Sequence, residues 1–124
     1  MENAKNIIKE LDRKQFMELI NSNNGLIIIK FSAEWCGPCK KIAPFVEDQF
    51  NKTPDSVTCV SIDVDDNFDL FAFMKKNKMM KGIPTIFAYK KENKTFVPDI
   101  STSGSDEKTL ITFFQDCVKY VDTL

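Results

Sequence analysis

The organisation of this chain follows from one segment, which reads Leu26-Ile27-Ile28-Ile29-Lys30-Phe31 and, three residues later, Trp35-Cys36-Gly37-Pro38-Cys39-Lys40. The apolar run 26–31 is typical of a buried parallel strand. Apolar residues with helical spacing from Ile42 to Phe50 predict a helix directly after it. Side chains three residues apart in the first turn of a helix lie on one face, so the two sulfurs can form a disulfide and be reduced again. The spacing therefore permits redox chemistry.

The strand-to-helix junction also predicts different roles for the two thiols. Cys36 would lie at the helix N-terminus, where free backbone N–H groups and the positive end of the helix dipole stabilise a thiolate. Cys39, one turn further, would be more buried. Gly37 leaves room for a target to approach, and Pro38 suits the first helical turn because no N–H is needed there. We therefore predict that Cys36 is an exposed nucleophile and that Cys39 is the resolving thiol.

The composition limits the class of protein. With 124 residues, of which 43% are hydrophobic, the chain can form one domain with its own core, and we assign residues 1–124 to it. A formal net charge of −1 argues against nucleic-acid binding. A polar beginning without an apolar leader, and no apolar run of membrane-spanning length, indicate a cytoplasmic protein without a membrane segment. In a reducing compartment four cysteines are more often catalytic or buried than structural.

The remaining sequence predicts alternating strands and helices. Before the central segment, residues 6–11 predict a short strand, and Asp12 with Gln15 forms the pattern of a capping box. After it, residues 57–64 alternate as a strand does, and Asp65-Asp66-Asn67 offers acceptors for the start of a helix that continues to about Asn77. Short connections of this kind make the central strands parallel.

The last third of the chain has a different pattern. Residues 85–89 predict a strand, 90–94 a polar turn, and 95–97 with Ile100 a return strand, which together form an antiparallel hairpin. From Asp106, apolar residues recur at helical spacing to the end of the chain. The sequence thus predicts an α/β fold with a mixed sheet flanked by helices.

Several motifs together resemble the thioredoxin family. The segment Trp35-Cys36-Gly37-Pro38-Cys39-Lys40 resembles the family's active site, and the resemblance extends over most of the chain in the expected order. The other matching positions are Phe31-Ser32-Ala33-Glu34, Pro44, Gly82-Ile83-Pro84-Thr85 and Gly104. The resemblance implies the thioredoxin fold, a central mixed five-stranded sheet flanked by four helices.

The resemblance also implies an activity and its partners. Family members reduce disulfides in other proteins by dithiol–disulfide exchange, and act as electron carriers in cell redox homeostasis. We expect disulfide-containing target proteins as substrates, and a flavin-containing, NADPH-dependent thioredoxin reductase as the partner that recycles the protein. No bound cofactor is expected, because the Cys36–Cys39 pair carries the electrons, and the protein is expected to act as a monomer.

The family's substrate-binding positions map onto residues on both sides of the cysteines. The resemblance implies a cis Ile83–Pro84 bond beside the sulfurs, with the backbone of Ile83 available to an extended target peptide, and Gly104 closing the groove. The positions concerned are Trp35, Gly37, Pro38, Ile83, Pro84 and Gly104. The simpler interpretations are an ordinary turn for Pro84, a turn glycine for Gly82 and Gly104, and a core position for Trp35.

Three other functions fit parts of the sequence. Half of a zinc site would explain Cys36 and Cys39, but Cys59 and Cys117 are far apart and the chain has no histidine, so we expect no metal. An oxidase or isomerase that donates its disulfide would use the same cysteines. A binding subunit of a larger complex would need only the fold.

Lys30 departs from the family pattern, which has a buried aspartate six residues before the nucleophile. A charged Lys30 would stabilise thiolates, whereas a desolvated neutral amine could take the proton of Cys39, which makes this residue a candidate modulator of the thiol pKa. Alternatively, its side chain reaches water or pairs with Asp63. Cys59 and Cys117 are expected to be inert core residues.

A basic run approaches the Pro84 loop, with lysines at 75, 76, 78 and 81. Such a run is usually a solvated surface, but here it could also favour acidic partners.

Overall fold

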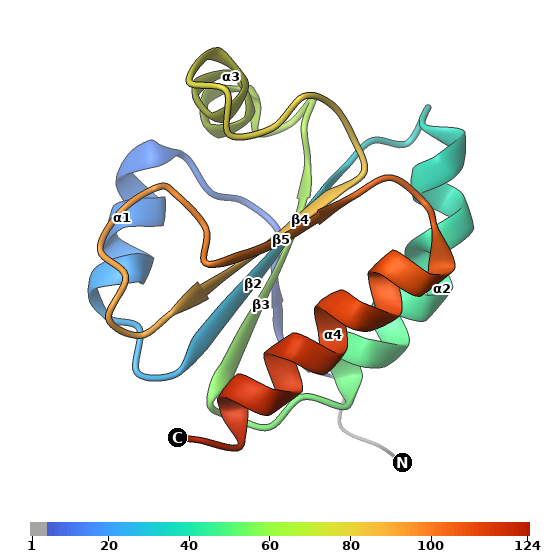
Figure 1. Cartoon of the computed structure of the whole chain (residues 1–124). Helices are drawn as coiled ribbons and strands as arrows, with labels where there is room; N and C mark the ends of the chain where they lie inside the picture. The colour runs from blue at the N-terminus through green and yellow to red at the C-terminus, as the bar shows by residue number, and fades with distance from the viewer. Residues whose placement is uncertain (1–4) are drawn as a thin grey trace.

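The computed structural model describes residues 5–124, which form a five-stranded mixed sheet with helices on both faces (Figure 1). The strands are β1 (Ile7–Ile8), β2 (Leu26–Ser32), β3 (Val57–Asp63), β4 (Thr85–Lys90) and β5 (Ile100–Ser103). The helices are α1 (Arg13–Asn21), α2 (Gly37–Asn51), α3 (Phe68–Lys76) and α4 (Glu107–Val121). The spatial order is β1-β3-β2-β4-β5, in which β1 and β2 run parallel to β3, while β4 runs antiparallel to β2 and β5 to β4. The predicted fold class is confirmed.

The sheet separates two hydrophobic cores, because successive side chains of its central strand point to opposite faces. Ile27 and Ile29 of β2 pack beneath α1 and α3, whereas Leu26 and Ile28 pack beneath α2 and α4. All four side chains are buried, as expected for a strand covered on both faces. Strand β2 is therefore the fixed element from which the cysteine segment leaves the sheet.

Two predicted helix starts are confirmed in detail. The Asp12 carboxylate accepts a hydrogen bond from the Gln15 N–H at 2.7 Å, and the Gln15 side chain accepts one from the Asp12 N–H at 2.9 Å. This is the reciprocal capping box, and Asp106 caps α4 by accepting from the Thr109 N–H at 3.0 Å. Both caps satisfy backbone N–H groups that have no partner within the helix.

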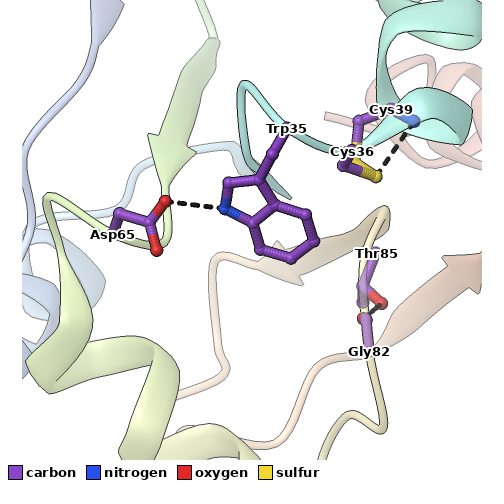
Figure 2. The surroundings of a disulfide bond; sticks show 6 residues. All are labelled: Trp35, Cys36, Cys39, Asp65, Gly82 and Thr85. Atoms are coloured by element: carbon purple, nitrogen blue, oxygen red, sulfur yellow. Dashed lines mark hydrogen bonds between the residues drawn. A yellow bond between two sulfur atoms is a disulfide. The ribbon is translucent and has the colours of Figure 1, made fainter.

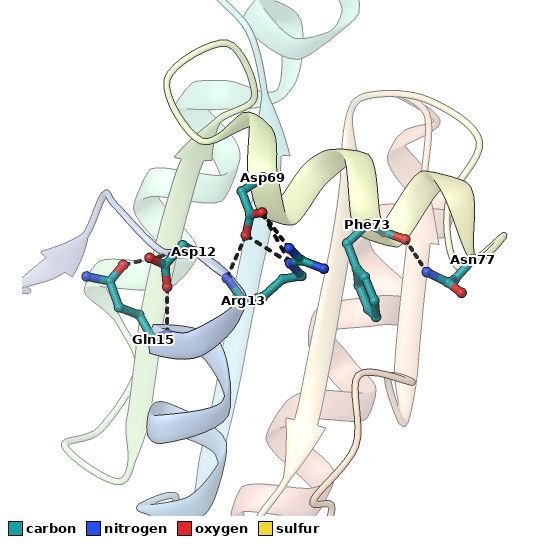
Figure 3. A network of polar contacts seen from close by, with 6 residues as sticks. All are labelled: Asp12, Arg13, Gln15, Asp69, Phe73 and Asn77. Atoms are coloured by element: carbon teal, nitrogen blue, oxygen red, sulfur yellow. Dashed lines mark hydrogen bonds and ion pairs between the residues drawn. The ribbon is translucent and has the colours of Figure 1, made fainter.

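Helices α1 and α3 are tied together by polar contacts across their first turns (Figure 3). Asp69 of α3 accepts a hydrogen bond from the Arg13 N–H at 3.0 Å and forms an ion pair with the Arg13 guanidinium at 3.1 Å. The same guanidinium lies 5.4 Å from the centre of the Phe73 ring. These contacts hold the pair of helices against one face of the sheet.

The first strand is shorter than predicted. Only Ile7 and Ile8 pair with β3, opposite Cys59 and Val60, although residues 6–11 were expected to be extended. The chain then turns away, since the Leu11 N–H donates to the side chain of Asn67 at 2.9 Å instead of to a neighbouring strand.

Asn67 also corrects the predicted start of α3. It occupies the N-cap position, but its side chain makes no capping hydrogen bond. Its amide group instead donates to the carbonyl oxygens of Lys9 and Asp63, at 3.3 and 3.0 Å. The buried Asn67 therefore joins the β1–α1 connection to the end of β3.

The predicted hairpin has its return strand in a different place. Residues 95–97 are not a strand, and β5 begins only at Ile100. The Asn93 side chain folds the connection by donating to the Val97 carbonyl at 2.7 Å, and Phe96 turns inward to stack on Phe16 at 4.8 Å between ring centres. The returning chain pairs with β4 only after Pro98, which has no N–H to donate to a sheet.

Candidate active site

The two cysteines lie where the sequence predicts, at the junction of β2 and α2 (Figure 2). Cys36 is the N-cap residue of α2, Cys39 lies in its first turn, and the two are joined by a disulfide bond with 5.2 Å between their Cα atoms. The Cys39 N–H points at the Cys36 sulfur at 3.2 Å, and Pro38 occupies the start of the helix. The helix N-terminus thus directs a backbone donor at the first sulfur.

The exposure of the two sulfur-bearing residues differs less than predicted. Cys36 is 5% exposed and Cys39 3%, so the prediction of an exposed Cys36 is wrong for this oxidised state. In a disulfide the two sulfurs cover one another, and both residues belong to the core cluster that includes Phe31 and Ala33. Neighbouring residues must therefore provide most of the surface that a target protein touches.

Trp35 provides part of that surface, because the residue is 69% exposed. Its indole N–H donates to the carboxylate of Asp65 at 2.8 Å, which holds the ring beside the disulfide (Figure 2). Asp65 was expected only as an acceptor at a helix start, so sequence reasoning missed this role. The paired acidic residues after β3 are the one signal that could have indicated it.

The surroundings of the indole are acidic. A hollow of about 580 Å³ beside Trp35 is lined by one lysine and four carboxylates, those of Glu34, Asp63, Asp65 and Asp66. Asp63 accepts a hydrogen bond from the Asp65 N–H at 2.8 Å and so fixes the turn that carries this group. The chain therefore places negative charge on one side of the cysteines.

The Pro84 loop lies on another side of the disulfide (Figure 2). The Ile83–Pro84 bond is cis, and Ile83 packs against the core cluster that contains both cysteines. The Pro84 carbonyl accepts a hydrogen bond from the Gly104 N–H at 2.9 Å, whereas Ile83 has no backbone hydrogen bond within residues 5–124. The N–H and the carbonyl group of Ile83 are therefore free to pair with another chain.

The two glycines near this loop differ in backbone conformation. Gly104 has φ +84°, a conformation that other residues rarely adopt, so glycine suits this position. Gly82 has no such angle, and a Cβ atom there would meet nothing within 4 Å. The Gly82 carbonyl accepts a hydrogen bond from the Thr85 hydroxyl at 2.6 Å.

Lys30 is buried in β2, opposite Ser61 of β3 and Ile86 of β4. Burial lowers the pKa of its amine, and the carboxylate of Glu47 on α2 opposes that shift. Within residues 5–124 Lys30 forms no ion pair, so the predicted contact with Asp63 is absent there. The Lys30 side chain is thus mostly buried, while its amine has no hydrogen-bond partner among the described residues and keeps contact with water.

The two remaining cysteines, Cys59 on β3 and Cys117 on α4, are buried in the core between the sheet and helices α2 and α4, as predicted. Burial raises the pKa of Cys59, and it raises the pKa of Cys117 to about 12. Within the described residues no group of three His, Cys, Asp or Glu side chains is placed to hold a metal ion. Nor does any described helix combine the length and apolar content needed to cross a membrane.

Comparisons with known proteins agree with this geometry. The thioredoxin family model matches residues 7–116. A thioredoxin from Ophiophagus hannah is 43% identical over 77 residues, which cover 62% of this chain and 69% of that protein. One from Oryctolagus cuniculus is 36% identical over 93 residues, covering 71% and 81% of the two chains. A solved structure of Plasmodium falciparum thioredoxin has a TM-score of 0.67 and 29% identity, and the match covers 88% of this chain and 98% of that one.

Proposed function

The chain belongs to the thioredoxin family, and on that premise we propose how its residues reduce protein disulfides. It is a thiol–disulfide oxidoreductase, and proteins of this family need no prosthetic group. In our proposal Cys36 is the nucleophile and Cys39 the resolving thiol. One observation carries it: Cys36 caps α2, with the Cys39 N–H directed at its sulfur.

The reaction transfers two electrons in two exchange steps. First, the Cys36 thiolate attacks one sulfur of the target disulfide, a Cys36–target bond forms, and the other target sulfur leaves as a thiolate that takes a proton. Second, Cys39 loses its proton and attacks the Cys36 sulfur, and the first target sulfur leaves and is protonated. The target is then a dithiol, and Cys36–Cys39 is the disulfide that the structure contains.

The helix N-terminus explains why Cys36 attacks first. A thiolate at the N-cap accepts the Cys39 N–H and lies at the positive end of the helix dipole. Cys39 lies inside the first turn, away from that end.

We assign target binding to the residues that surround the sulfurs. Trp35 offers an exposed ring held by Asp65, and the free backbone of Ile83 can pair with an extended target segment. Backbone pairing of this kind is tolerant of sequence. The other substrate-binding positions in this proposal are Gly37, Pro38, Pro84 and Gly104.

We propose that Lys30 modulates the thiols from beneath the site. Its side chain is mostly buried on the strand that leads to Cys36, and this partial desolvation lowers the pKa of its amine. The test is the pH profile of the reaction in Lys30→Met. A rise in the pH midpoint indicates a lost ammonium, and a slower second step at an unchanged midpoint indicates a lost base. An identical profile would exclude the role.

The physiological setting is also a proposal. We infer that residues 1–124 act as a single monomeric domain in the cytoplasm, where the unpaired thiols of Cys59 and Cys117 would stay reduced. The disulfide must be reduced again after each turnover. We propose that thioredoxin reductase does this with electrons from NADPH, as the resemblance to the family suggests, so that the protein serves electron transport.

A trapping experiment tests the assignment of the two thiols. A Cys39→Ser variant should accumulate covalent complexes with target proteins, because the second step is lost while the first remains. Mass spectrometry should find Cys36 in every complex, and Cys36→Ser should give none. Complexes formed through Cys59 or Cys117, or none at all from Cys39→Ser, would contradict the assignment.

A further inference from the structure

A polar groove with a volume of about 660 Å³ begins at the Pro84 loop and runs between the end of α3 and β5. Its walls include Ile83, Pro84 and Gly104, so it is continuous with the proposed target-binding surface. Two lysines, Lys78 and Lys81, lie in the lining, which contains no carboxylate. The rest of the lining is apolar or bears hydroxyl groups. The groove therefore carries positive charge, and one end of it is the Pro84 loop.

Both groove lysines are available to a partner. Each is exposed, and within residues 5–124 the two ion pairs, Arg13–Asp69 and Lys52–Asp48, leave Lys78 and Lys81 without an acidic partner. The other two lysines of the basic run differ, since Lys75 and Lys76 belong to α3 and do not line the groove. Two of the four lysines in the basic run therefore line the groove.

The backbone at Lys78 gives a second, independent reason to assign it a function. Helix α3 ends with the Lys78 N–H bonded to the Lys75 carbonyl at 3.1 Å and the Met79 N–H bonded to the Met74 carbonyl at 2.9 Å. This is a Schellman motif, in which the position of Lys78 is usually glycine. Lys78 has φ +62°, the left-handed conformation that is unfavourable for a residue with a Cβ. Lys78 therefore carries a charged side chain at a position where the backbone favours glycine.

The surface on the Asp65 side of the Trp35 indole bears the opposite charge. The hollow beside Trp35 has four carboxylates and one lysine, and Figure 2 shows the indole between Asp65 and the Gly82–Thr85 turn. A target segment that is acidic where it meets the groove is attracted at one end and is repelled if it binds the other way round. The charges therefore select both a partner and an orientation.

We propose that the groove formed by Lys78, Lys81 and the Pro84 loop binds an acidic segment of the target polypeptide, so that disulfides flanked by acidic residues are reduced preferentially. This inference rests on the proposed function, because it concerns the surface next to Cys36. Exposed ion pairs contribute modestly, so each lysine should change the rate by about two- to fivefold. Because these charges are exposed, the preference should decrease as salt is added.

The experiment compares two peptides that carry the same mixed disulfide to a fluorescent thiol, one flanked by glutamates and one by lysines. The reduced protein should cleave the glutamate peptide faster at low salt. Lys78→Gly and Lys81→Gln should each lower that rate by about two- to fivefold. Lys14→Gln, a matched loss of charge on α1 outside the groove, should leave the rate unchanged.

Lys78→Gly separates a functional role from a structural one. Glycine relieves the left-handed conformation, so the melting temperature should rise or stay constant while the preference for the glutamate peptide decreases. Equal rates for the two peptides in the unmodified protein, or an equal loss in Lys14→Gln, would overturn the proposal. If neither peptide is cleaved, the proposed function itself fails, which is a different result.

Discussion

The chain contains two pairs of cysteines that differ in reactivity because their surroundings differ. Cys36 and Cys39 are three residues apart at a helix N-terminus and form a disulfide. Cys59 of β3 and Cys117 of α4 lie in the core on the α2 and α4 face of the sheet, as free thiols whose pKa values are raised by burial. All four are at most 5% exposed, so burial alone does not distinguish the pairs. What differs is the backbone donor and the helix dipole directed at Cys36.

The largest effect that tests this comparison is on turnover. Cys36→Ser should lower the rate of protein disulfide reduction by about a thousandfold or more, because no other thiol can replace the nucleophile. Cys39→Ser should also abolish multiple turnover. The measurement is reduction of a protein disulfide with an external reductant that recycles the enzyme.

The buried pair supplies the controls. Cys59→Ala and Cys117→Ala should retain turnover within about twofold, since neither thiol takes part in the exchange. A large loss in either variant would mean that the two pairs are not chemically separate.

The next effect concerns the stability that the buried pair provides. Cys117→Ser places a hydroxyl where the sulfur has no hydrogen-bond partner within residues 5–124, and should lower the free energy of unfolding by about 1 to 3 kcal/mol. Cys59→Ser should cost less, because the hydroxyl of Thr53 lies 3.6 Å from the present sulfur and can pair with the new one. Urea unfolding measures both, and equal losses would contradict the environment described for Cys59.

The raised pKa of Cys117 should make the stability of the protein depend on pH. The folded protein holds the pKa of Cys117 at about 12, above its ordinary value of 9.0, so the folded state keeps a proton that the unfolded chain releases. The stabilisation is therefore complete below pH 9 and is lost progressively as the pH rises from about 9 to 12. Cys117→Ala should lose less stability over this range, as measured by urea midpoints, and parallel curves would refute the assignment.

The smallest effect is expected at the exposed side of the site. Asp65→Asn weakens the hydrogen bond to the indole of Trp35, and should lower stability by less than about 1 kcal/mol and turnover by less than about fivefold. The chain has one tryptophan, so its fluorescence reports the change directly. A large loss of stability would show that Trp35 supports the fold as well as the surface.

Local patterns allowed most of the fold to be predicted from the sequence. The capping box at Asp12 and Gln15, the last helix from about Asp106 and the cysteine junction each depend on residues a few positions apart, and the structure confirms all three. The cis bond at Pro84 was expected from the family motif, and it is present.

The errors arose where distant residues decide the local structure. Asn67 does not cap α3, because its side chain is held by Leu11, 56 residues away in sequence. Residues 95–97 leave the sheet because Phe96 packs against Phe16 and Phe73. The need for glycine at position 25 was also missed, since a Cβ there would overlap the carbonyl of Ser56 across the sheet. None of these partners can be identified from local sequence patterns.

One measurement tests the central claim most directly, namely that the helix N-terminus activates Cys36. The reduced protein is treated with iodoacetamide over a series of pH values, and mass spectrometry follows each cysteine separately. Cys36 should be alkylated first, with a midpoint below that of free cysteine measured in the same series, while Cys59 and Cys117 stay unmodified until the protein unfolds. Alkylation of Cys36 no faster than that of free cysteine at any pH would contradict the account.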